Sequence, residues 1–368
     1  MRVVFRNLFR RRVRTALSIL GVAIGVGSIV AFSSMGEGFK RSINEYALQT
    51  GADLVVVEHN VADPAFGRIP AEVVESLRRH PNIRALGSSC AMPATLEGGT
   101  APLLVIGRDP AEPIIRAYRN PAMRGRLLEA HHELMMGEIL AAELGKKVGD
   151  DMRLFQQSFK IVGIYRTGVR WENGGVIIHM EAFRKAMKMA PGSTMGVFLF
   201  LKDPDRLKET AFELAMQHPQ LRILPAAFLS SGFEQIAYVD AFIWVISLAA
   251  LIVGAIGILN TMLMSVSERV REIGTLRAFG WTGAMVLRMI LAEGLMTSLL
   301  GGLAGFGVGV AGAEALMRLV PQGALAAAYV PQIFVTGMAA SIGVGFLGAL
   351  YPAWRASRLA PAEALRYE

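Results

Sequence analysis

The chain has 368 residues, of which 53% are hydrophobic and 18% are charged, with a formal charge of +8 and a single cysteine, Cys90. Average soluble proteins carry about 25% charged residues, so this composition excludes a disordered or wholly solvated chain. One cysteine excludes an intramolecular disulfide, a thiolate metal cluster and a CxxC redox pair. The net positive charge would indicate a nucleic-acid surface only if the basic residues gathered on one solvated face.

Four stretches are apolar and long enough to cross a bilayer, which requires about 20 residues at a helical rise of about 1.5 Å each. The sequence predicts transmembrane helices at residues 15–36, 241–264, 284–313 and 332–354. The segments between and beyond these helices are 1–14, 37–240, 265–283, 314–331 and 355–368.

The distribution of Lys and Arg predicts the orientation, because the cytoplasmic flanks of membrane helices are enriched in these residues. Outside residues 37–239, 13 of 14 basic residues lie in or beside 1–14, 265–283 and 355–368, and the loop before the fourth span carries only Arg318. Both termini are therefore predicted to be cytoplasmic, in a multi-pass protein of the cell inner membrane. The excess of Lys and Arg therefore indicates the orientation of the chain in the membrane rather than a nucleic-acid-binding surface, and we predict no nucleic-acid partner.

The N-terminus also has features of a cleavable signal peptide: basic residues, an apolar stretch and then Ala31-Phe32-Ser33. Its apolar run is long for a signal peptide, and cleavage would leave only three spans. We therefore expect residues 15–36 to remain as the first transmembrane helix.

Residues 37–240 are long enough for one or two compact folds, with 24 Lys or Arg and 23 Asp or Glu up to residue 239. Short apolar or β-branched runs predict strands at 53–58, 103–107, 160–165, 176–179 and 197–202. Helices are predicted at 71–79, 138–144, 181–189 and 205–217, with helical stalks at 37–49 and 232–240 that loose loops would fit equally well. The predicted fold class is an α+β membrane protein: four transmembrane helices with a large mixed α/β extracytoplasmic domain between helices 1 and 2.

Sites for catalysis, metals and nucleotides are not evident. The group His131-His132-Glu133 resembles part of a metal site, but a ligand set needs defined spacing and further donors, so we predict an exposed polar turn and no metal. The phosphate loop GxxxxGK[ST] does not occur, and the GxGxxG match at 307–312 lies inside a predicted span. We expect no catalytic residue and no cofactor bound by this chain.

The loop 265–283 is predicted to contain a short amphipathic helix. Ser265 and Glu268 have capping-box spacing, Val270 and Ile273 share a face, and Gly280 supplies a stop. Its charges have both signs, which favours a protein groove over a purely basic lipid anchor. The charged residues of this helix are Glu268, Arg269, Arg271, Glu272 and Arg277.

The third span carries two notable features. Gly301, Gly305 and Gly309 recur every four residues, a pattern that permits close helix packing.

Glu293 lies about nine residues, or roughly 14 Å, into the span. An intramembrane carboxylate indicates a proton path, a substrate contact or an interhelical hydrogen bond. With no evident cationic partner, we predict a protonated packing residue whose replacement by Gln is milder than replacement by Ala.

Several motifs resemble those of the MacB/FtsX-type permeases of ABC transporters. The two most specific are NTMLMSVSERVREIGTLRA at 260–278 and YPAWRASRLAPAEALRYE at 351–368. Further matches are NLFR at 7–10, LGVAIGV at 20–26 and IVGI at 161–164. The resemblance extends over the whole chain.

The resemblance implies a permease subunit that forms a homodimer or heterodimer and binds ABC ATPase subunits, which supply ATP and Mg²⁺. It implies that residues 268–277 form the coupling helix on the ATPase. The residues it assigns to ATPase coupling are Glu268, Arg269, Arg271, Glu272, Ile273, Gly274, Leu276 and Arg277. It further implies mechanotransmission, in which ATP-driven movement of the stalks and outside domain handles an export, lipoprotein or envelope substrate, with a periplasmic adaptor as a further partner.

The sequence departs from the family at two places, and one rival function stays open. Phe279-Gly280-Trp281 stands where the family usually has Leu-Gly-Ala, a change that would tune the ATPase contact. Ala360 precedes Pro361 where an Asp cap is common, which would cost a terminal helix about 1 kcal/mol. The rival is a regulatory transmembrane subunit that activates an extracytoplasmic cell-wall hydrolase.

Overall fold

The computed structural model describes residues 12–59, 61, 66–95, 102–319 and 326–360. The chain divides into two compact units. The helical unit takes the segment up to Glu37, Val239–Leu316 and the chain from Ala327, and the mixed unit takes Gly38–Tyr238 with Met317–Ala326. Residues 1–11, 320–325 and 361–368, with the predictions made for them, lie outside the described residues.

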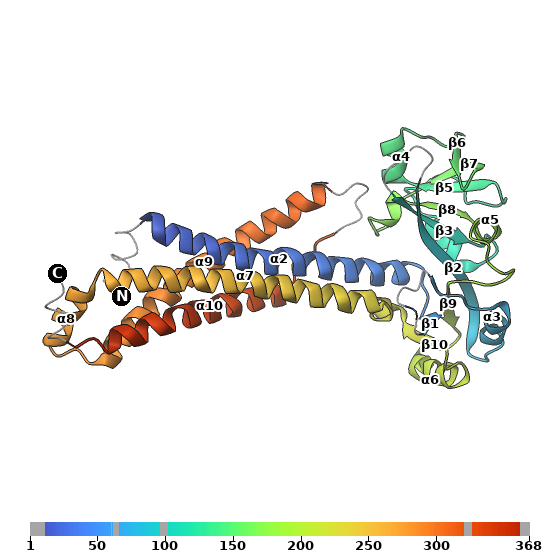
Figure 1. Ribbon diagram of the computed structural model, residues 1–368. Helices are drawn as coiled ribbons and strands as arrows, with labels where there is room; N and C mark the ends of the chain where they lie inside the picture. Colours follow the sequence, from blue (N-terminus) through green and yellow to red (C-terminus); the bar gives the residue numbers. More distant parts are fainter. Residues whose placement is uncertain (1–11, 60, 62–65, 96–101, 320–325, 361–368) are drawn as a thin grey trace. The chain divides into compact units, whose positions relative to one another are not determined.

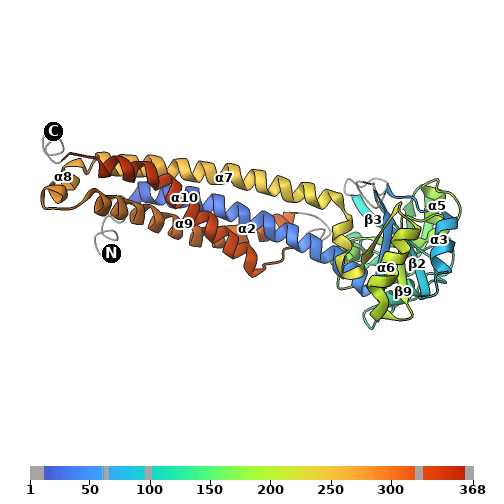
Figure 2. The same ribbon diagram turned by 90° about the horizontal axis from the view of Figure 1, so that it is seen from below.

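In the described part of the chain, four long helices supply most of the helical unit, and they lie side by side in both ribbon views (Figures 1 and 2). They are α2 (Arg12–Gln49), α7 (Glu234–Ser267), α9 (Gly283–Leu319) and α10 (Pro331–Ser357). All four are long and apolar enough to cross a membrane. Helix α2 continues without a break to Gln49 and α7 begins at Glu234, so residues 37–49 and 234–240 are helical rather than loose.

Helices α9 and α2 approach each other closely at Gly301, Gly305 and Gly309, which we call the glycine ladder. A Cβ added at Gly301 would lie 2.7 Å from Cβ of Val22, and one added at Gly305 would lie 2.8 Å from Cβ of Val26. At Gly309 the added atom would lie 2.7 Å from a backbone carbonyl oxygen of α2. Because real Cβ atoms do not make such short contacts, only glycine permits this separation of the two backbones.

The buried side chains at the apolar centre of the helical unit come from α2, α7 and α10, and partly buried side chains of α9 pack against them. Helix α10 also approaches α7, since a Cβ at Gly348 would lie 2.9 Å from the carbonyl oxygen of Ala255. The buried side chains of this centre are Val22, Val26, Val30, Ile258, Met262, Ile333, Val344 and Ala349.

The glycine ladder yields a test of helix packing. Gly305→Leu forces α9 away from α2, and we expect it to lower the thermal unfolding midpoint of the detergent-solubilised protein, consistent with an overpacking cost of about 1–3 kcal/mol. Gly307→Leu is the matched control, because a Cβ at Gly307 has no atom within 4 Å and leucine is the better helix former. Equal midpoints for the two variants would contradict the packing described.

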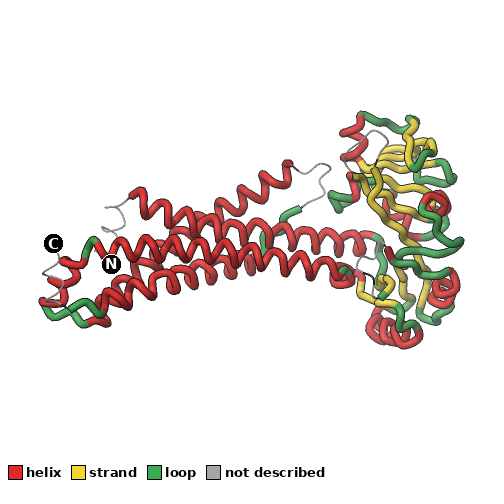
Figure 3. Tube along the Cα trace, in the orientation of Figure 1, coloured by secondary structure: helices red, strands yellow, loops and turns green. Residues whose placement is uncertain are grey.

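The mixed unit is built on one sheet, drawn in yellow in Figure 3, which has ten strands among the described residues. The order is β10-β1-β9-β2-β3-β8-β5-β7-β4, and β6 pairs with β7 outside this path. The first five strands are β1 (Leu54–Glu58), β2 (Ile83–Thr95), β3 (Pro102–Arg108), β4 (Arg124–Gly125) and β5 (Glu133–Gly137). The others are β6 (Asp151–Leu154), β7 (Gln157–Tyr165), β8 (Val176–His179), β9 (Gly196–Leu201) and β10 (Leu221–Pro225).

Helices and short 3-10 turns connect these strands. The helices are α3 (Ala71–Arg78), α4 (Glu138–Leu144), α5 (Met180–Ala186) and α6 (Leu207–Gln217). The 3-10 turns are η2 (Pro113–Tyr118), η3 (Glu172–Gly174), η4 (Pro204–Arg206) and η5 (Ala226–Gly232). Helix α5 is shorter than the predicted 181–189, and the predicted helix 205–217 divides into η4 and α6.

Strand β1 shows why the sheet is buried on both sides. Alternate side chains point to opposite faces of a strand. Leu54 and Val56 belong to the apolar cluster that includes α3 and α6. Val55 and Val57 belong to another cluster, which includes Tyr46 from the end of α2. Both faces of β1 are therefore covered, which explains why its sequence is a continuous apolar run.

Strand β2 joins the two halves of the sheet and was missed by the sequence prediction. Ser89 of β2 pairs with Gly196 of β9, and the next residue, Cys90, pairs with Gly107 of β3. Gly87, Ser88, Ser89 and Pro93 interrupt its apolar pattern, so local periodicity does not mark it. The short strands β4, β5, β6 and β10 were also not predicted.

The predicted polar turn at 131–133 is correct for two residues and wrong for the third. His131 and His132 are exposed, and the His131 ring lies 4.0 Å from that of His179 between centroids. Glu133 begins β5 and is buried, bonded to the Arg126 guanidinium and to the backbone N–H groups of residues 129 and 130. Among the described residues, no group of three or more His, Cys, Asp or Glu is placed to hold a metal ion.

The environment of Glu133 predicts a pH-dependent contribution to stability. The hydrogen bond from Arg126 holds the pKa of Glu133 down at about 2. The ionised carboxylate therefore stabilises the fold above its ordinary pKa of about 4.5, and this contribution is lost as the pH falls from there towards 2. We expect Glu133→Gln to lower the thermal midpoint near neutral pH and to match the wild type at about pH 2.

Glu143→Gln is the control for this experiment, because Glu143 is an exposed glutamate of the same unit. It should follow the wild type at every pH. A constant difference between the wild type and Glu133→Gln across the acid range would contradict the assigned pKa shift.

Candidate functional site

A nine-residue helix, α8 (Val270–Ala278), connects α7 to α9. The predicted capping box is wrong, because α7 continues through Ser265 to Ser267 and the residue preceding α8 is Arg269, whose side chain makes no capping hydrogen bond. The predicted stop at Gly280 is correct. Gly280 has a φ of +93°, and Trp281 N–H donates to the Leu276 carbonyl oxygen at 3.1 Å, which closes the helix end.

The inner face of α8 packs on the ends of the long helices. Ile273 is 3% exposed and Gly274 is also buried. Ile273 belongs to an apolar cluster that takes residues from α7, α9 and α10, so three of the four long helices contribute to the surface beneath α8. The other buried residues of the cluster are Val266, Val286, Ile290, Ala353 and Ala356.

An ion pair fixes the beginning of α8 to α9. Arg269 Nη1 lies 3.1 Å from Glu293 Oε2 and 3.4 Å from Oε1. The two side chains are 15% and 8% exposed. Arg269 Nε also lies 3.7 Å from Glu272 Oε2. The expectation that Glu293 has no cationic partner is therefore wrong, because its partner reaches it from the start of α8.

A second arginine fixes the end of α8 to α10. Arg277 Nη1 donates to the Ser357 carbonyl oxygen at 2.6 Å and to the Leu359 carbonyl oxygen at 3.2 Å. These carbonyls lie at and beyond the end of α10, where the helix leaves them without intrahelical partners. Arg269 and Arg277, predicted to face a partner, therefore turn inward.

The outer face of α8 is polar with one large aromatic side chain. Glu272, Thr275 and Phe279 are exposed at spacings of three and four residues, so they share one side of α8 and its C-terminal end. Glu268, in the turn before α8, is also exposed. Phe279 is 83% exposed, and Arg271 lies beside this row. The face presents charges of both signs next to an apolar ring. Leu276 is partly buried at its edge.

The mixed unit holds a buried polar cluster that the sequence analysis missed. Arg108, at the end of β3, is fully buried and donates to the Tyr46 hydroxyl of α2 and to the Ser88 carbonyl oxygen at 3.4 Å. Glu172 is also buried and accepts a hydrogen bond from the Tyr118 hydroxyl at 2.6 Å. Burial raises the pKa of Glu172. No sequence signal distinguishes Arg108 from the exposed arginines of this unit.

Two family models match the chain. Residues 15–216 match the MacB-like periplasmic core domain, and residues 244–361 match the FtsX-like permease C-terminal domain. The chain therefore belongs to the MacB/FtsX-like family and is an ABC transporter permease of that family.

Curated relatives match over the full length of this chain. It is 27% identical over 395 residues to the macrolide export ATP-binding/permease protein MacB of Hyphomonas neptunium, covering 100% of this chain and 60% of that protein. It is 24% identical over 398 residues to the ABC transporter permease YknZ of Bacillus subtilis, covering 98% of that protein. The solved extracellular domain of YknZ from Gram-positive bacteria has a TM-score of 0.35 at 13% identity, covering 47% of this chain and 98% of that domain.

The ion pair between α8 and α9 changes the expectation for Glu293→Gln. Removing one partner of a buried ion pair costs about 3–5 kcal/mol, because the other charge stays buried without compensation. We therefore expect Glu293→Gln to lower the thermal midpoint clearly, and Arg269→Gln with Glu293→Gln to cost less than the sum of the two single changes.

Glu314→Gln, at an exposed site on the same helix, is the matched control and should have little effect. Strictly additive effects of the two single substitutions would show that Arg269 and Glu293 do not stabilise each other.

Proposed function

We propose that this permease couples ATP hydrolysis by a separate ABC ATPase to movement of its mixed unit. The observation that carries the proposal is the fixation of α8 at both ends, with a polar and aromatic face left open. In this proposal α8 is the coupling helix. The ATPase binds ATP and Mg²⁺, and it supplies the phosphate loop that does not occur in this sequence.

The attachment of α8 makes it suited to transmit force. A helix that rested only on apolar contacts could slide or roll when a partner pushed on it. The Arg269–Glu293 pair directs a push at the start of α8 into α9, and the bonds of Arg277 direct a push at its end into α10. Of the residues proposed for coupling, Arg269 and Arg277 hold the helix, and Ile273 and Gly274 provide its inner face.

The outer face is suited to a protein groove. Glu268, Arg271 and Glu272 offer both signs of charge, which a purely anionic lipid surface would not favour. Phe279 offers an apolar ring that a hydrophobic depression between charged residues would accept. The ATPase surface we propose for this face carries complementary charges around such a depression.

The helices offer a route for movement beyond the bilayer. Helix α2 is one continuous element from Arg12 to Gln49, and its last residues belong to the mixed unit. We propose that movement of the spans reaches the mixed unit along α2 and α7 by mechanotransmission, and acts on an export, lipoprotein or other envelope substrate already outside the membrane.

We base the proposed membrane orientation on the charge distribution and the proposed subunit composition on the family. The basic flanks favour the inner membrane with both termini cytoplasmic, which makes the mixed unit extracytoplasmic. Two permease subunits and two ATPase subunits form the transporter, and a periplasmic adaptor is a further partner. The chain spans about 60% of the length of the MacB relative, so the substrate named for that protein is not assigned to this one.

Charge reversal on the outer face of α8 tests the proposal. Arg271→Glu combined with Glu272→Lys reverses two exposed charges. The change at Glu272 also removes its 3.7 Å contact with Arg269 Nε, whereas the Arg269–Glu293 pair and the hydrogen bonds of Arg277 remain. We expect the variant to fold normally, with a wild-type thermal midpoint, but to lose most co-purification with the co-expressed ATPase and most stimulated ATP hydrolysis in nanodiscs.

The matched control is Lys208→Glu with Glu209→Lys, which reverses two neighbouring exposed charges on α6. It should retain ATPase binding and stimulated hydrolysis. Normal ATPase association of the α8 variant would overturn the assignment of α8 as the coupling helix.

A further inference from the structure

One exposed side of the end of α10 changes in chemical character along its length. Leu347, Tyr351, Trp354 and Arg358 follow one another at spacings of four, three and four residues, so they share one side of this helix end. All four are exposed. This row of side chains, which we call the α10 stripe, runs from an aliphatic side chain through two aromatic rings to a cation.

The cationic end of the α10 stripe is held by ring contacts. Arg358 Cζ lies 4.4 Å from the centre of the Trp354 ring, a favourable cation–π distance. The Trp354 ring in turn lies 6.2 Å from that of Tyr351 between centroids, with an angle of 31° between their planes. Stacking uses the flat face of the guanidinium and leaves the N–H groups at its edge able to donate to an anion.

The backbone on both sides of Arg358 is also anchored. The carbonyl oxygens of Ser357 and Leu359 each accept a hydrogen bond from Arg277. The Leu359 side chain packs against the apolar cluster beneath α8. Because the residues before and after it are fixed, Arg358 is presented outward in a set position, which reduces the ordering cost of binding.

The charges near this helix end favour an anion. Arg355 is exposed one turn before Arg358. Helix α10 contains no Asp or Glu, and neither arginine forms an ion pair with another described residue. Two cations one turn apart can donate together to a group with several acceptor oxygens, such as a phosphate.

The order of side chains in the α10 stripe matches the order of groups in a phospholipid. Helix α10 is long and apolar enough to cross a membrane. Leu347 precedes Arg358 by eleven residues, about 16 Å at a rise of about 1.5 Å each, and half of the hydrocarbon core is about 15 Å. Tyr and Trp side chains favour the boundary between acyl chains and headgroups. An acyl chain beside Leu347 would therefore place its phosphate at the level of the two arginines.

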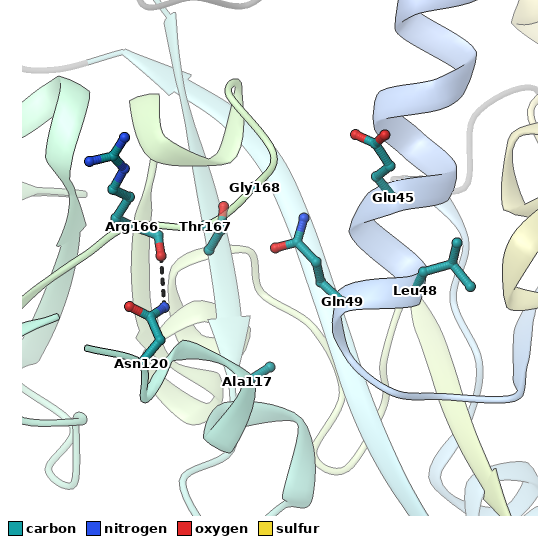
Figure 4. A pocket seen from close by; sticks show the side chains of 8 residues that line it. All are labelled: Glu45, Leu48, Gln49, Ala117, Asn120, Arg166, Thr167 and Gly168. Carbon is teal, nitrogen blue, oxygen red and sulfur yellow. Dashed lines mark hydrogen bonds between the residues drawn. The ribbon is translucent and has the colours of Figure 1, made fainter. Parts of the chain in front are cut away.

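The pocket of the mixed unit is not suited to an anion. It has a volume of about 590 Å³, and the last turns of α2 and the segment 166–168 contribute to its lining (Figure 4). Figure 4 shows the Arg166 guanidinium turned away from α2, and its Nε lies 3.4 Å from Glu138 Oε2. Glu45 adds a carboxylate to the lining. The stacked, outward-facing cation of α10 has no counterpart among these pocket residues.

We infer that the end of α10 binds one anionic phospholipid. Arg355 and Arg358 donate to its phosphate. The rings of Tyr351 and Trp354 lie at the level of its glycerol, and one acyl chain lies along Leu347. A zwitterionic phospholipid binds less tightly, because its own cation is brought close to the two arginines. The inference goes beyond the proposed function and depends neither on the ATPase nor on which side of the membrane this helix end lies.

Dioleoylphosphatidylglycerol and dioleoylphosphatidylcholine, which share their acyl chains, are the probes. Delipidated full-length protein in detergent micelles is titrated with each lipid, and bound lipid is counted by native mass spectrometry. We expect saturable binding of phosphatidylglycerol at least about tenfold tighter than that of phosphatidylcholine. Arg358→Gln should weaken phosphatidylglycerol binding about tenfold, the scale of one charge-assisted hydrogen bond, and leave phosphatidylcholine binding unchanged.

Arg318→Gln is the matched control. Arg318 is an exposed arginine in the last turn of α9, whereas Gly283, at the start of α9, is the residue that lies against Ser357. One turn before Arg318 stands Glu314 rather than an aromatic residue. This variant should bind both lipids as the wild type does.

A double variant tests whether Trp354 acts by positioning Arg358. Trp354→Leu keeps an apolar side chain but removes the ring, and we expect it to weaken phosphatidylglycerol binding about threefold, the scale of an exposed cation–π contact. Combined with Arg358→Gln, it should cause little further loss, because the guanidinium that the ring positions is gone. Thermal midpoints should match the wild type in all variants.

Three results would overturn the inference. They are equal binding of the two lipids, the same loss in Arg318→Gln as in Arg358→Gln, and a change from dimer to monomer in Trp354→Leu with unchanged lipid binding, which would show that a second copy covers the α10 stripe. Co-purification with the ATPase is measured in parallel. Loss of ATPase association with intact lipid binding would count against the proposed function alone.

Discussion

A helix of nine residues is too short to be stable by itself in water, so α8 exists only because its neighbours hold it. Three kinds of contact do this: an apolar cluster beneath Ile273, an ion pair at the start and two carbonyl acceptors at the end. Each contact joins a different part of α8 to α9, α10 or α7. The same contacts that make the helix stable make it a rigid attachment to the bundle.

This arrangement divides the charged residues of α8 by direction. The sequence does not distinguish Arg269 and Arg277 from Arg271, yet of these three arginines only Arg271 is exposed. The division explains how a loop rich in charge can lie at the end of an apolar bundle. Arg269 contacts Glu293 of α9 and Arg277 contacts carbonyl oxygens at the end of α10, whereas Glu268, Arg271 and Glu272 are exposed.

The sequence predicted those parts of the fold that have a local signature. Strands β1, β8 and β9 are continuous apolar runs, and the α4 and α8 helices end at glycines with positive φ. Strand β2 has no such signature, because Gly87 and Pro93 break its pattern and its place is set by partners on both sides.

Long-range polar contacts were not predictable for a different reason. Arg269 and Glu293 are separated by 24 residues, and their contact depends on the rotation of α8 about its own axis. That rotation is set by the apolar cluster beneath the helix. The burial of Arg108 likewise depends on the end of α2 packing against the sheet, which periodicity within either segment cannot show.

The unbroken course of α2 also restricts how the family can vary in length. The helix has 38 residues, and each residue turns it by about 100°. One residue inserted before Tyr46 would swing that side chain away from Arg108 and change which residues of this helix end face the core. Insertions and deletions in this part of α2 are therefore tolerated only in numbers that complete whole turns, such as about seven or eleven residues. The surface loops of the sheet can change length without this restriction, because they do not set the direction of a helix face.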